Sequence, residues 1–366
     1  MARPTKCNLE TYTLFLIATP HRAECTKLAA VMENMSHDAV NKFLLRNDFT
    51  PKSLFKEIKP YINLHGGILS VDDTVLDKQY SDPNKTDLIS YFWSGKHHES
   101  VKGINLITLF YSDLKGNSVP VNFRIYDPHQ KVPKLDKNGK PLLKDNEVQY
   151  RTKTKNEYYQ EMLQEVLDWG LIPSVATGDC WYATDENLKF LRDKKIGFCF
   201  GLKSNRIVSN LPGRYTHVSD LNIPKDGLVT HLKKFGFIKV FKTVFKNQDE
   251  YFAIWIPELD KDNYDQPVID SQQALSKITF EQFETIHDIH WKIEMYHRAI
   301  KQLVSIEKFM VRKSRAVLNH IFCSLRAFCK LEFKRINMEI NNWYQIKRDL
   351  YKPVVKQFIM SEMGLA

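Results

Sequence analysis

Apolar and polar positions change their spacing several times along the chain, and each change marks a different kind of element. Residues 1 to about 65 carry apolar positions at helical spacing, for example in Lys27–Met32 and Ala39–Leu45, which predicts short helices. Ser36 and Asp38 suit helix caps before the second of these segments. A small bundle that contains a helix-turn-helix is one interpretation of this region.

From Gly66 onward the pattern favours strands. Ile68–Asp72 is typical of a buried strand that ends in acidic residues, and Gly103–Tyr111 and Val119–Tyr126 form a predicted hairpin. Residues 129–155 are rich in polar residues and predict an excursion from the fold.

Strands and helices then alternate. Thr154 and Glu157 match a capping box, which predicts a helix that Gly170 closes. A strand over Pro173–Asp179, a helix over Thr184–Lys194 and a strand over Ile196–Phe200 follow. This order predicts a mixed α/β sheet.

The last third of the chain departs from that alternation. Residues 201 to about 280 hold Gly, Pro and β-rich pieces such as Phe237–Phe241 and Tyr251–Ile256, which predict an inserted small β unit. From Phe280 the pattern is helical, and we expect Pro353 to break the last helix. The predicted regions are therefore a helical region (1–65), in which a helix-turn-helix would make it a DNA-binding region, the first part of an α/β core (66–200), the β-rich insertion (201–280), a helix that completes the core (281–310) and a basic helical region (311–366).

Composition narrows the class of protein. The chain has 366 residues, enough for two or three domains, and its 43% hydrophobic and 26% charged residues argue against wholesale disorder. No apolar run approaches the roughly 18–20 residues of a membrane span, and the start shows no signal peptide. Six cysteines without a CxxC pair indicate reduced thiols. We therefore expect a cytoplasmic protein with no membrane partner.

The net charge of +10 is concentrated near the end of the chain. Residues 295–366 contain 14 Lys or Arg against 5 Asp or Glu, which favours a polyanionic partner such as nucleic acid. A solvated helical surface explains the same charge equally well. The residues that suit contacts along a DNA backbone are Arg312, Lys313, Arg315, Arg326, Lys330, Lys334 and Arg335.

Three acidic positions could carry chemistry: Asp72 or its neighbour Asp73, Asp179, and Glu294. The aspartates end predicted strands, where side chains of an α/β sheet converge on ligands. Glu294 lies on a helix, about 100° from the apolar stripe that faces the core. That stripe comprises Ile286, Ile289, Ile293, Tyr296, Ile300, Leu303 and Val304, and the residues on the face of Glu294 are His287, His290, Trp291, Arg298 and Lys301.

Three converging carboxylates repel one another unless a cation neutralises them, and Mg²⁺ or Mn²⁺ prefers such oxygen ligands. Two ions about 4 Å apart would activate a nucleophile and stabilise the leaving oxygen of a phosphodiester displacement. Alternatively, the aspartates merely end strands and Glu294 is solvated. A zinc site on His287, His290, Glu294 and His297 is disfavoured, because these residues span roughly 15 Å of helix.

The segments Val71–Thr74, Gly178–Tyr182 and His290–Gln302 resemble the three signature blocks of bacterial insertion-sequence DDE transposases. The resemblance covers about residues 66–310 and includes a β-rich insertion before the glutamate, as in the cut-and-paste group. It implies an RNase H-like α/β core flanked by helical N- and C-terminal regions.

The resemblance also assigns residues. Asp72, Asp179 and Glu294 match the catalytic metal ligands, which would hold two Mg²⁺ or Mn²⁺ ions, and Asp73 would face the opposite way. Lys301 matches a phosphate contact. The positions where the family has Tyr and Arg are occupied here by His287 and His290, and we expect these and Arg298 to face DNA. Trp255 is, by analogy, a residue for stacking on a flipped base, although a core position suits it as well, and Trp181 has the same two interpretations.

The implied function is cut-and-paste DNA transposition, in which water cleaves a phosphodiester at the element end and the freed 3′-hydroxyl attacks target DNA. Its partners would be double-stranded DNA, at the element ends and the target, and a second copy of the chain in a homodimer on DNA. The protein would then associate with the bacterial nucleoid. The alternatives are a catalytically silent DNA-binding protein derived from such an element and a metal-dependent nuclease without strand transfer.

Overall fold

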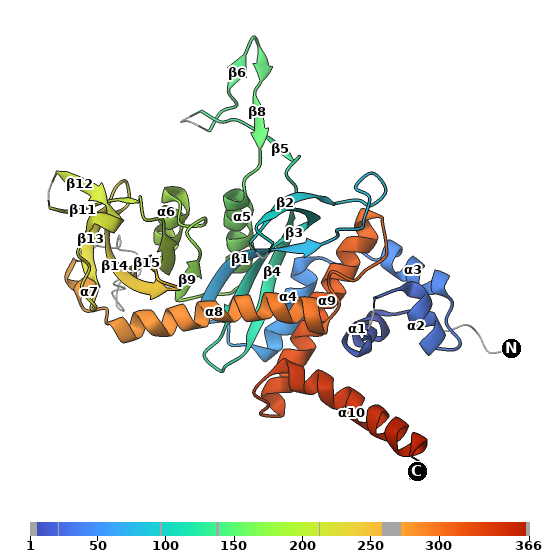
Figure 1. Ribbon diagram of the computed structural model, residues 1–366. Helices are drawn as coiled ribbons and strands as arrows, with labels where there is room; N and C mark the ends of the chain where they lie inside the picture. The colour runs from blue at the N-terminus through green and yellow to red at the C-terminus, as the bar shows by residue number, and fades with distance from the viewer. Residues whose placement is uncertain are drawn as a thin grey trace.

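An eleven-stranded mixed sheet runs through the middle of the molecule in the computed structural model (Figure 1). The structure describes residues 6–363 except 21, 96, 137–138, 212 and 258–271. The strand order is β12-β11-β13-β14-β15-β10-β9-β1-β3-β2, with β4 also paired to β3. The strands of this sheet are β1 (Ile68–Asp77), β2 (Ser90–Ser94), β3 (Glu99–Ser112), β4 (Ser118–Tyr126), β9 (Val175–Gly178), β10 (Gly197–Leu202), β11 (Ile207–Leu211), β12 (Arg214–His217), β13 (Leu228–Leu232), β14 (Gly236–Phe245) and β15 (Gln248–Trp255).

Helices cover both faces of the sheet. On one face, Asn122 of β4 donates from its side-chain amide to the carbonyl oxygen of Met162 in α5 at 3.1 Å. On the other, the ring of Tyr296 in α8 stacks on Phe110 of β3. The α-helices are α1 (Leu9–Ala18), α2 (Cys25–Val31), α3 (His37–Arg46), α4 (Pro51–Ile58), α5 (Lys155–Asp168), α6 (Asp185–Asp193), α7 (Gln272–Ser276), α8 (Phe280–Leu303), α9 (Ser314–Asn337) and α10 (Trp343–Glu362). Within the described residues, no helix is both long and apolar enough to cross a membrane.

Most of the predicted elements are present, and two differ from expectation. β1 does not end at its aspartates but continues for five residues beyond Asp72, to Asp77. Pro353 lies inside α10 and does not break it. The capping box of Thr154 and Glu157 forms as expected at the start of α5.

The N-terminal helices pack against the long helix α9 and share its core. Tyr12 is buried and its hydroxyl lies 2.9 Å from Nδ1 of His320 in α9. The side-chain amide of Asn319 donates to the carbonyl oxygens of Leu44 and Asn47. The predicted helical character of this region is therefore confirmed, whereas DNA binding by it stays a prediction.

The β-rich insertion is not a separate unit, because it extends the core sheet. β10 pairs in parallel with β9 on one side and antiparallel with β15 on the other, and Phe198 of β10 lies opposite Trp255 of β15. The strands expected within residues 201–280 are present, and their pairing with the core sheet is a long-range contact that has no local sequence signature. Residues 258–271 of the predicted insertion lie outside the described residues.

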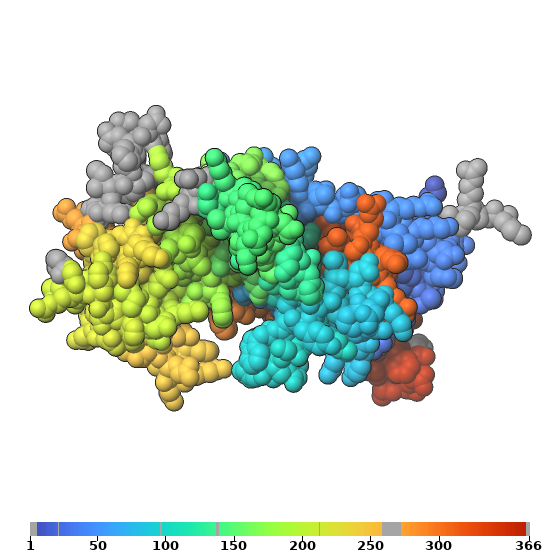
Figure 2. Space-filling model, turned by 90° about the horizontal axis from the view of Figure 1, so that it is seen from above, coloured from blue at the N-terminus to red at the C-terminus, as the bar shows by residue number. Residues whose placement is uncertain are grey.

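A narrow arm of short strands stands out from the body between β4 and α5 (Figure 1). Two small hairpins build it: β5 (Lys131–Pro133) pairs with β8 (Tyr150–Thr152), and β6 (Leu143–Lys144) pairs with β7 (Glu147–Val148). Seen from above (Figure 2), the green arm lies between the yellow-green strands of the insertion and the blue and cyan N-terminal half. The predicted polar excursion is thus an ordered projection.

Candidate active site

Asp72 and Asp179 occupy matching positions on neighbouring strands. β1 and β9 run parallel, with Val71 paired to Gly178, so the next residue on each strand brings the two aspartates side by side. The packing below them is tight, because a Cβ at Gly178 would lie 2.6 Å from the Phe200 ring. β9 ends at Gly178, and among the described residues no other strand pairs with β1 on that side from Asp72 to Asp77. This interruption of the sheet opens the site.

Helix α8 brings Glu294 and His297 to the same place. One ligand atom from each of Asp72, Glu294 and His297 lies within 4.8 Å of the others. Within this group, Nδ1 of His297 lies 3.4 Å from Oδ2 of Asp72. His297 follows Glu294 by three positions, so both project from one side of the helix. The group contains two carboxylates and one imidazole, which is a donor set that suits a divalent cation.

The electrostatics of the three carboxyl groups show that they crowd one another. Burial raises the pKa of Asp179 to about 7, and the charge of Asp72 adds to the rise. Partial burial and the charge of Asp72 also raise the pKa of Glu294. Burial favours the protonated form of Asp72 too, but its contact with His297 holds its pKa below the ordinary value. Asp72 therefore stays ionised, and its negative charge disfavours ionisation of Asp179 and Glu294. A bound cation would stabilise the ionised forms of all three carboxyl groups.

Asp73 points away from this group, as expected for the next residue of a strand. Its carboxylate accepts hydrogen bonds from Nζ of Lys155 at 2.7 Å, the side-chain amide of Asn105 at 2.7 Å and the hydroxyl of Tyr182 at 3.0 Å. These partners satisfy Asp73 within the protein. The structure thus favours Asp72 over Asp73 as the first metal ligand.

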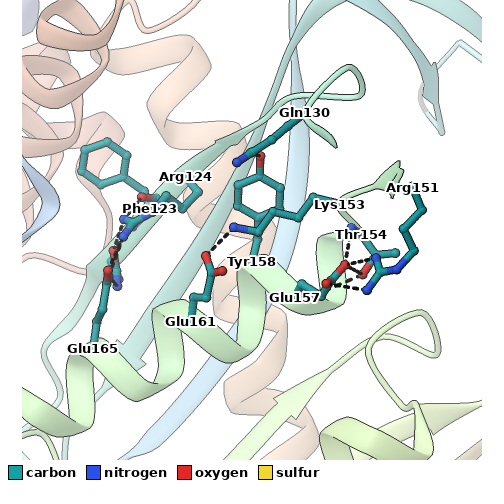
Figure 3. Close-up of polar contacts among 11 residues, drawn as sticks. Phe123, Arg124, Gln130, Arg151, Lys153, Thr154, Glu157, Tyr158, Glu161 and Glu165 are labelled. Atoms are coloured by element: carbon teal, nitrogen blue, oxygen red, sulfur yellow. Dashed lines mark hydrogen bonds and ion pairs between the residues drawn. The ribbon is translucent and has the colours of Figure 1, made fainter. Parts of the chain in front are cut away.

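The helix that supplies Lys155 is itself braced by ion pairs (Figure 3). Glu157, Glu161 and Glu165 follow one another at intervals of four along α5, so they share one face. Glu157 pairs with Arg151 at 2.6 Å and Glu161 with Lys153 at 2.6 Å, both at the base of the arm. Glu165 accepts from Arg124 on β4, also at 2.6 Å. Helix α5 is therefore fixed to the arm at its start and to the sheet near its end.

The aspartates of the site line a cavity of about 720 Å³, whose wall includes neither Glu294 nor His297. Asp72, Asp73 and Asp179 lie on its wall together with Lys155 and Lys301. The aromatic residues on the wall are Phe92, Trp93, Tyr126, Trp181 and Tyr182. Carboxylates in such a cavity can hold a metal ion at one phosphate of a nucleotide chain. Lysines can contact its other phosphates, and flat rings can stack on its bases.

The predicted DNA-contact residues of α8 have different surroundings. Lys301 lies on the cavity wall, where its Nζ donates to the carbonyl oxygen of Val75 at 2.6 Å. Arg298 is exposed and lines a second cavity of about 330 Å³. Burial lowers the pKa of His290 to about 4, so this ring is neutral at pH 7 and lies within the field of Asp72. His287 packs edge-on against Phe252 of β15.

The structure buries Trp255 and exposes Trp181, whereas base stacking by Trp255 would require an exposed ring. Trp255 is 1% exposed and stacks on Phe198 in the core, so the prediction of a DNA contact there is wrong. Trp181 is 68% exposed beside Asp179, and Nζ of Lys203 lies 4.2 Å from its ring centroid. Trp255 is buried because it lies in an apolar segment of β15, a strand with neighbours on both sides.

Several C-terminal basic residues are engaged within the protein. Arg326 contacts Glu57 at 2.6 Å and Glu10 at 2.9 Å, and Lys330 contacts Glu10 at 2.8 Å. Arg335 pairs with the buried Glu332 at 2.7 Å. Arg326 and Lys330 hold α9 to α1 and α4, and Arg335 pairs within α9, so part of the basic excess has a structural explanation. For Arg312, Lys313, Arg315 and Lys334, DNA contact stays a prediction.

Two features of the site escaped the sequence reasoning. His297 was considered only as part of an improbable zinc site, although its spacing of three from Glu294 was the available signal. Lys155 was considered only as part of a polar excursion, because its approach to Asp73 depends on the fold.

Fold and site together define a class. A mixed sheet with aspartates on adjacent strands and a glutamate from a covering helix is the layout of an RNase H-like α/β core with flanking helical regions. Residues 2–216 match the family model described as "DDE superfamily endonuclease", and residues 138–329 match the one described as "Transposase DDE domain". The chain therefore belongs to the DDE superfamily of transposases and endonucleases.

Other comparisons are more distant. The solved "Drosophila P element transposase strand transfer complex" is similar over 98% of this chain and 86% of that chain, with 8% identity and a TM-score of 0.28. A likeness this low assigns no role to any residue. A comparison with curated proteins gives no match.

Proposed function

We propose that the protein is a metal-dependent DNA transposase that cleaves DNA at the ends of an insertion sequence and joins them to target DNA. The observation that carries this proposal is that Asp179 and Glu294 both lie near Asp72 at the interruption of the sheet, in a chain of the DDE superfamily. Three carboxyl groups whose charges conflict are unfavourable in a protein that only binds DNA, because they weaken its fold and repel phosphates.

The residues present fit divalent cations. Asp72, Asp179 and Glu294 offer hard oxygen ligands, and the buried Nε2 of His297 has no hydrogen-bond partner among the described residues, so its ring can turn without losing one there. We propose that these residues hold two Mg²⁺ or Mn²⁺ ions. When bound, such ions polarise the scissile phosphate and make water or a 3′-hydroxyl nucleophilic at neutral pH.

The chain's own groups would perform the remaining tasks. Asp72 keeps its charge because His297 stabilises its ionised form, which makes it the first anchor for a cation. Lys301 donates to the backbone carbonyl oxygen of Val75 at 2.6 Å and lies 4.0 Å from Glu307, which fixes its ammonium group at the cavity wall, where it would contact a phosphate. Tyr182 and Lys155 fix Asp73, which keeps β1 in place at the wall of the same cavity.

Double-stranded DNA is the proposed substrate, both at the element ends and at the target. Strand transfer joins two ends to one target, so we propose that the chain works as a homodimer on DNA. By the same argument we propose that the protein acts in the cytoplasm of a bacterium and lies on the nucleoid when it is bound to DNA.

The test uses purified protein and DNA that carries the terminal repeats flanking its gene, with Mg²⁺, Mn²⁺ or neither. We expect metal-dependent nicking and joining, abolished in Glu294→Gln with end binding retained. Glu284→Gln, an exposed glutamate on the same helix, is the matched control and keeps full activity.

Each alternative gives a different result in that assay. Metal-dependent cutting without joining would identify a nuclease. Binding without cutting in either metal would identify a silent DNA-binding descendant. Equal loss of binding and cutting in Glu294→Gln would remove the metal-ligand assignment, because a ligand's loss should spare the DNA contacts.

A further inference from the structure

Strand β2 carries two large aromatic side chains on its solvent face. Tyr91 is 64% exposed and Trp93 is 66% exposed, whereas Phe92 between them is 8% exposed and packs near Tyr126. Alternate residues of a strand share a face, so Tyr91 and Trp93 lie on the same side, roughly 6.6 Å apart along the chain. In the part of the chain that the structure describes, β2 pairs only with β3, which leaves its other edge open. Two adjacent exposed aromatics at a sheet edge are unusual in a surface without a ligand.

This pair adjoins the catalytic cavity. Trp93, Ser94 and Gly95 line the same cavity as Asp72 and Asp179. The turn that follows is tied to the end of β1, because Nε2 of His97 lies 3.2 Å from Oδ2 of Asp77. Trp93 is thus held at one mouth of the cavity, and Tyr91 lies two residues before it on the same face of β2.

Positive charge accompanies the aromatic rings. Lys102 on β3 is the cross-strand partner of Tyr91 and shares its face of the sheet. Its Nζ contacts the carbonyl oxygen of Ser81 at 3.4 Å, which leaves two ammonium protons for a phosphate. Lys301 and Lys155 also line the cavity, where Lys155 is paired with Asp73 at 2.7 Å. Flat rings beside spaced cations are the elements of a site for single-stranded nucleic acid.

We propose that Tyr91 and Trp93 form a stacking platform for unpaired bases of the DNA strand that passes through the catalytic cavity. Exposed rings of this kind favour a single strand over a duplex, because unpaired bases present free faces for stacking. Bases of an intact duplex are stacked on one another and cannot cover both rings. This inference rests on the proposed function and deepens it: the preferred substrate is a DNA end with an unpaired segment next to the scissile phosphate.

The test measures DNA binding without metal, so that no cutting takes place. Fluorescence anisotropy compares a blunt duplex with the same duplex carrying a single-stranded overhang. Stacking on aromatic side chains strengthens binding roughly 5- to 150-fold per base, and we expect the wild-type protein to prefer the overhang by at least that lower factor. Tyr91→Ala with Trp93→Ala should remove the preference and leave affinity for the blunt duplex within about twofold.

Two further variants make the result specific. Tyr91→Phe with Trp93→Phe keeps flat rings and should retain most of the preference. Phe358→Ala removes an equally exposed ring from α10, outside the cavity, and should change nothing. An alanine variant that keeps the overhang preference would overturn the proposal. The proposal would also be overturned if this variant bound DNA as the wild type does but differed from it in oligomeric state, measured by light scattering. Tyr91 and Trp93 would then contact another protein chain.

Failure of the platform and failure of the proposed function are distinguishable. Metal-dependent cleavage by the wild-type protein without any overhang preference would refute the platform alone. Overhang preference without cleavage in Mg²⁺ or Mn²⁺ would support the platform and refute the transposase activity. Absence of DNA binding would overturn both.

Discussion

Replacing Asp179 by asparagine should make the metal-free protein more stable at neutral and alkaline pH. Burial and the neighbouring charge of Asp72 raise the pKa of Asp179 from the ordinary 3.8 to about 7. Between those values the native state holds a proton that the unfolded chain has released, so stability falls as pH rises through this range. The Asp179→Asn variant would avoid this loss, while the amide oxygen of the new side chain could still accept the hydrogen bond from the Trp181 backbone.

The pKa difference corresponds to about 4 kcal/mol of lost stability above pH 7. Water that enters the open cavity screens part of the charge, so we expect Asp179→Asn to gain about 1–4 kcal/mol near pH 8 and almost nothing near pH 4. For a chain of this size the gain corresponds to a rise in melting temperature of about 1–5 °C.

The assay is thermal unfolding of both proteins in a chelator across that pH range, repeated with Mg²⁺ or Mn²⁺. Saturating metal at about a hundred times its Kd should stabilise the wild-type protein by about 2.7 kcal/mol and stabilise Asp179→Asn less. A variant that is less stable than the wild type near pH 8 without metal would refute the reasoning, because Asp179 would then contribute to the fold and not strain it.

Three further changes probe the surroundings of the site. His297→Ala should weaken Mn²⁺ binding about 10- to 100-fold by calorimetry, and unchanged affinity would exclude this ring from the metal centre. Lys155→Met should lower stability in urea by about 1–3 kcal/mol, and adding Asp73→Asn should restore most of it; additive losses would show that the pair is not coupled. Trp255→Ala should cost about 3–5 kcal/mol, whereas Trp181→Ala should stay within about 0.5 kcal/mol, and similar losses would contradict their placement.

Residues whose structural signals are local could be predicted from the sequence. The start of α5 follows from its capping box, and Asp179 follows a strand whose apolar run is short and closed by Gly178. The same reasoning ended β1 too early at Asp72, because acidic residues within a strand look like its end unless the open edge beside them is known. The length of such a strand depends on the strands beside it in space, and the local sequence pattern does not encode those neighbours.

The remaining differences also arise from long-range contacts. Trp255 and Trp181 are chemically alike, and only the pairing of β15 with β10 buries the first. His297 becomes part of the site because α8 lies across β1 with that face inward. Pro353 is accommodated within α10, where the helix is largely exposed and few neighbours constrain its path.

The way the insertion joins the sheet has a consequence for shorter relatives. All six residues of β10 (Gly197–Leu202) are buried, and β15 covers the backbone groups along one of its edges. A chain cut back to a minimal core would leave that edge bare, with unpaired amides beside an apolar strand that invites aggregation. Here the sheet instead tapers to β12, a four-residue strand that runs from Arg214 to His217 and is largely exposed. We therefore expect a trimmed version of this protein to aggregate unless a designed polar edge replaces the insertion.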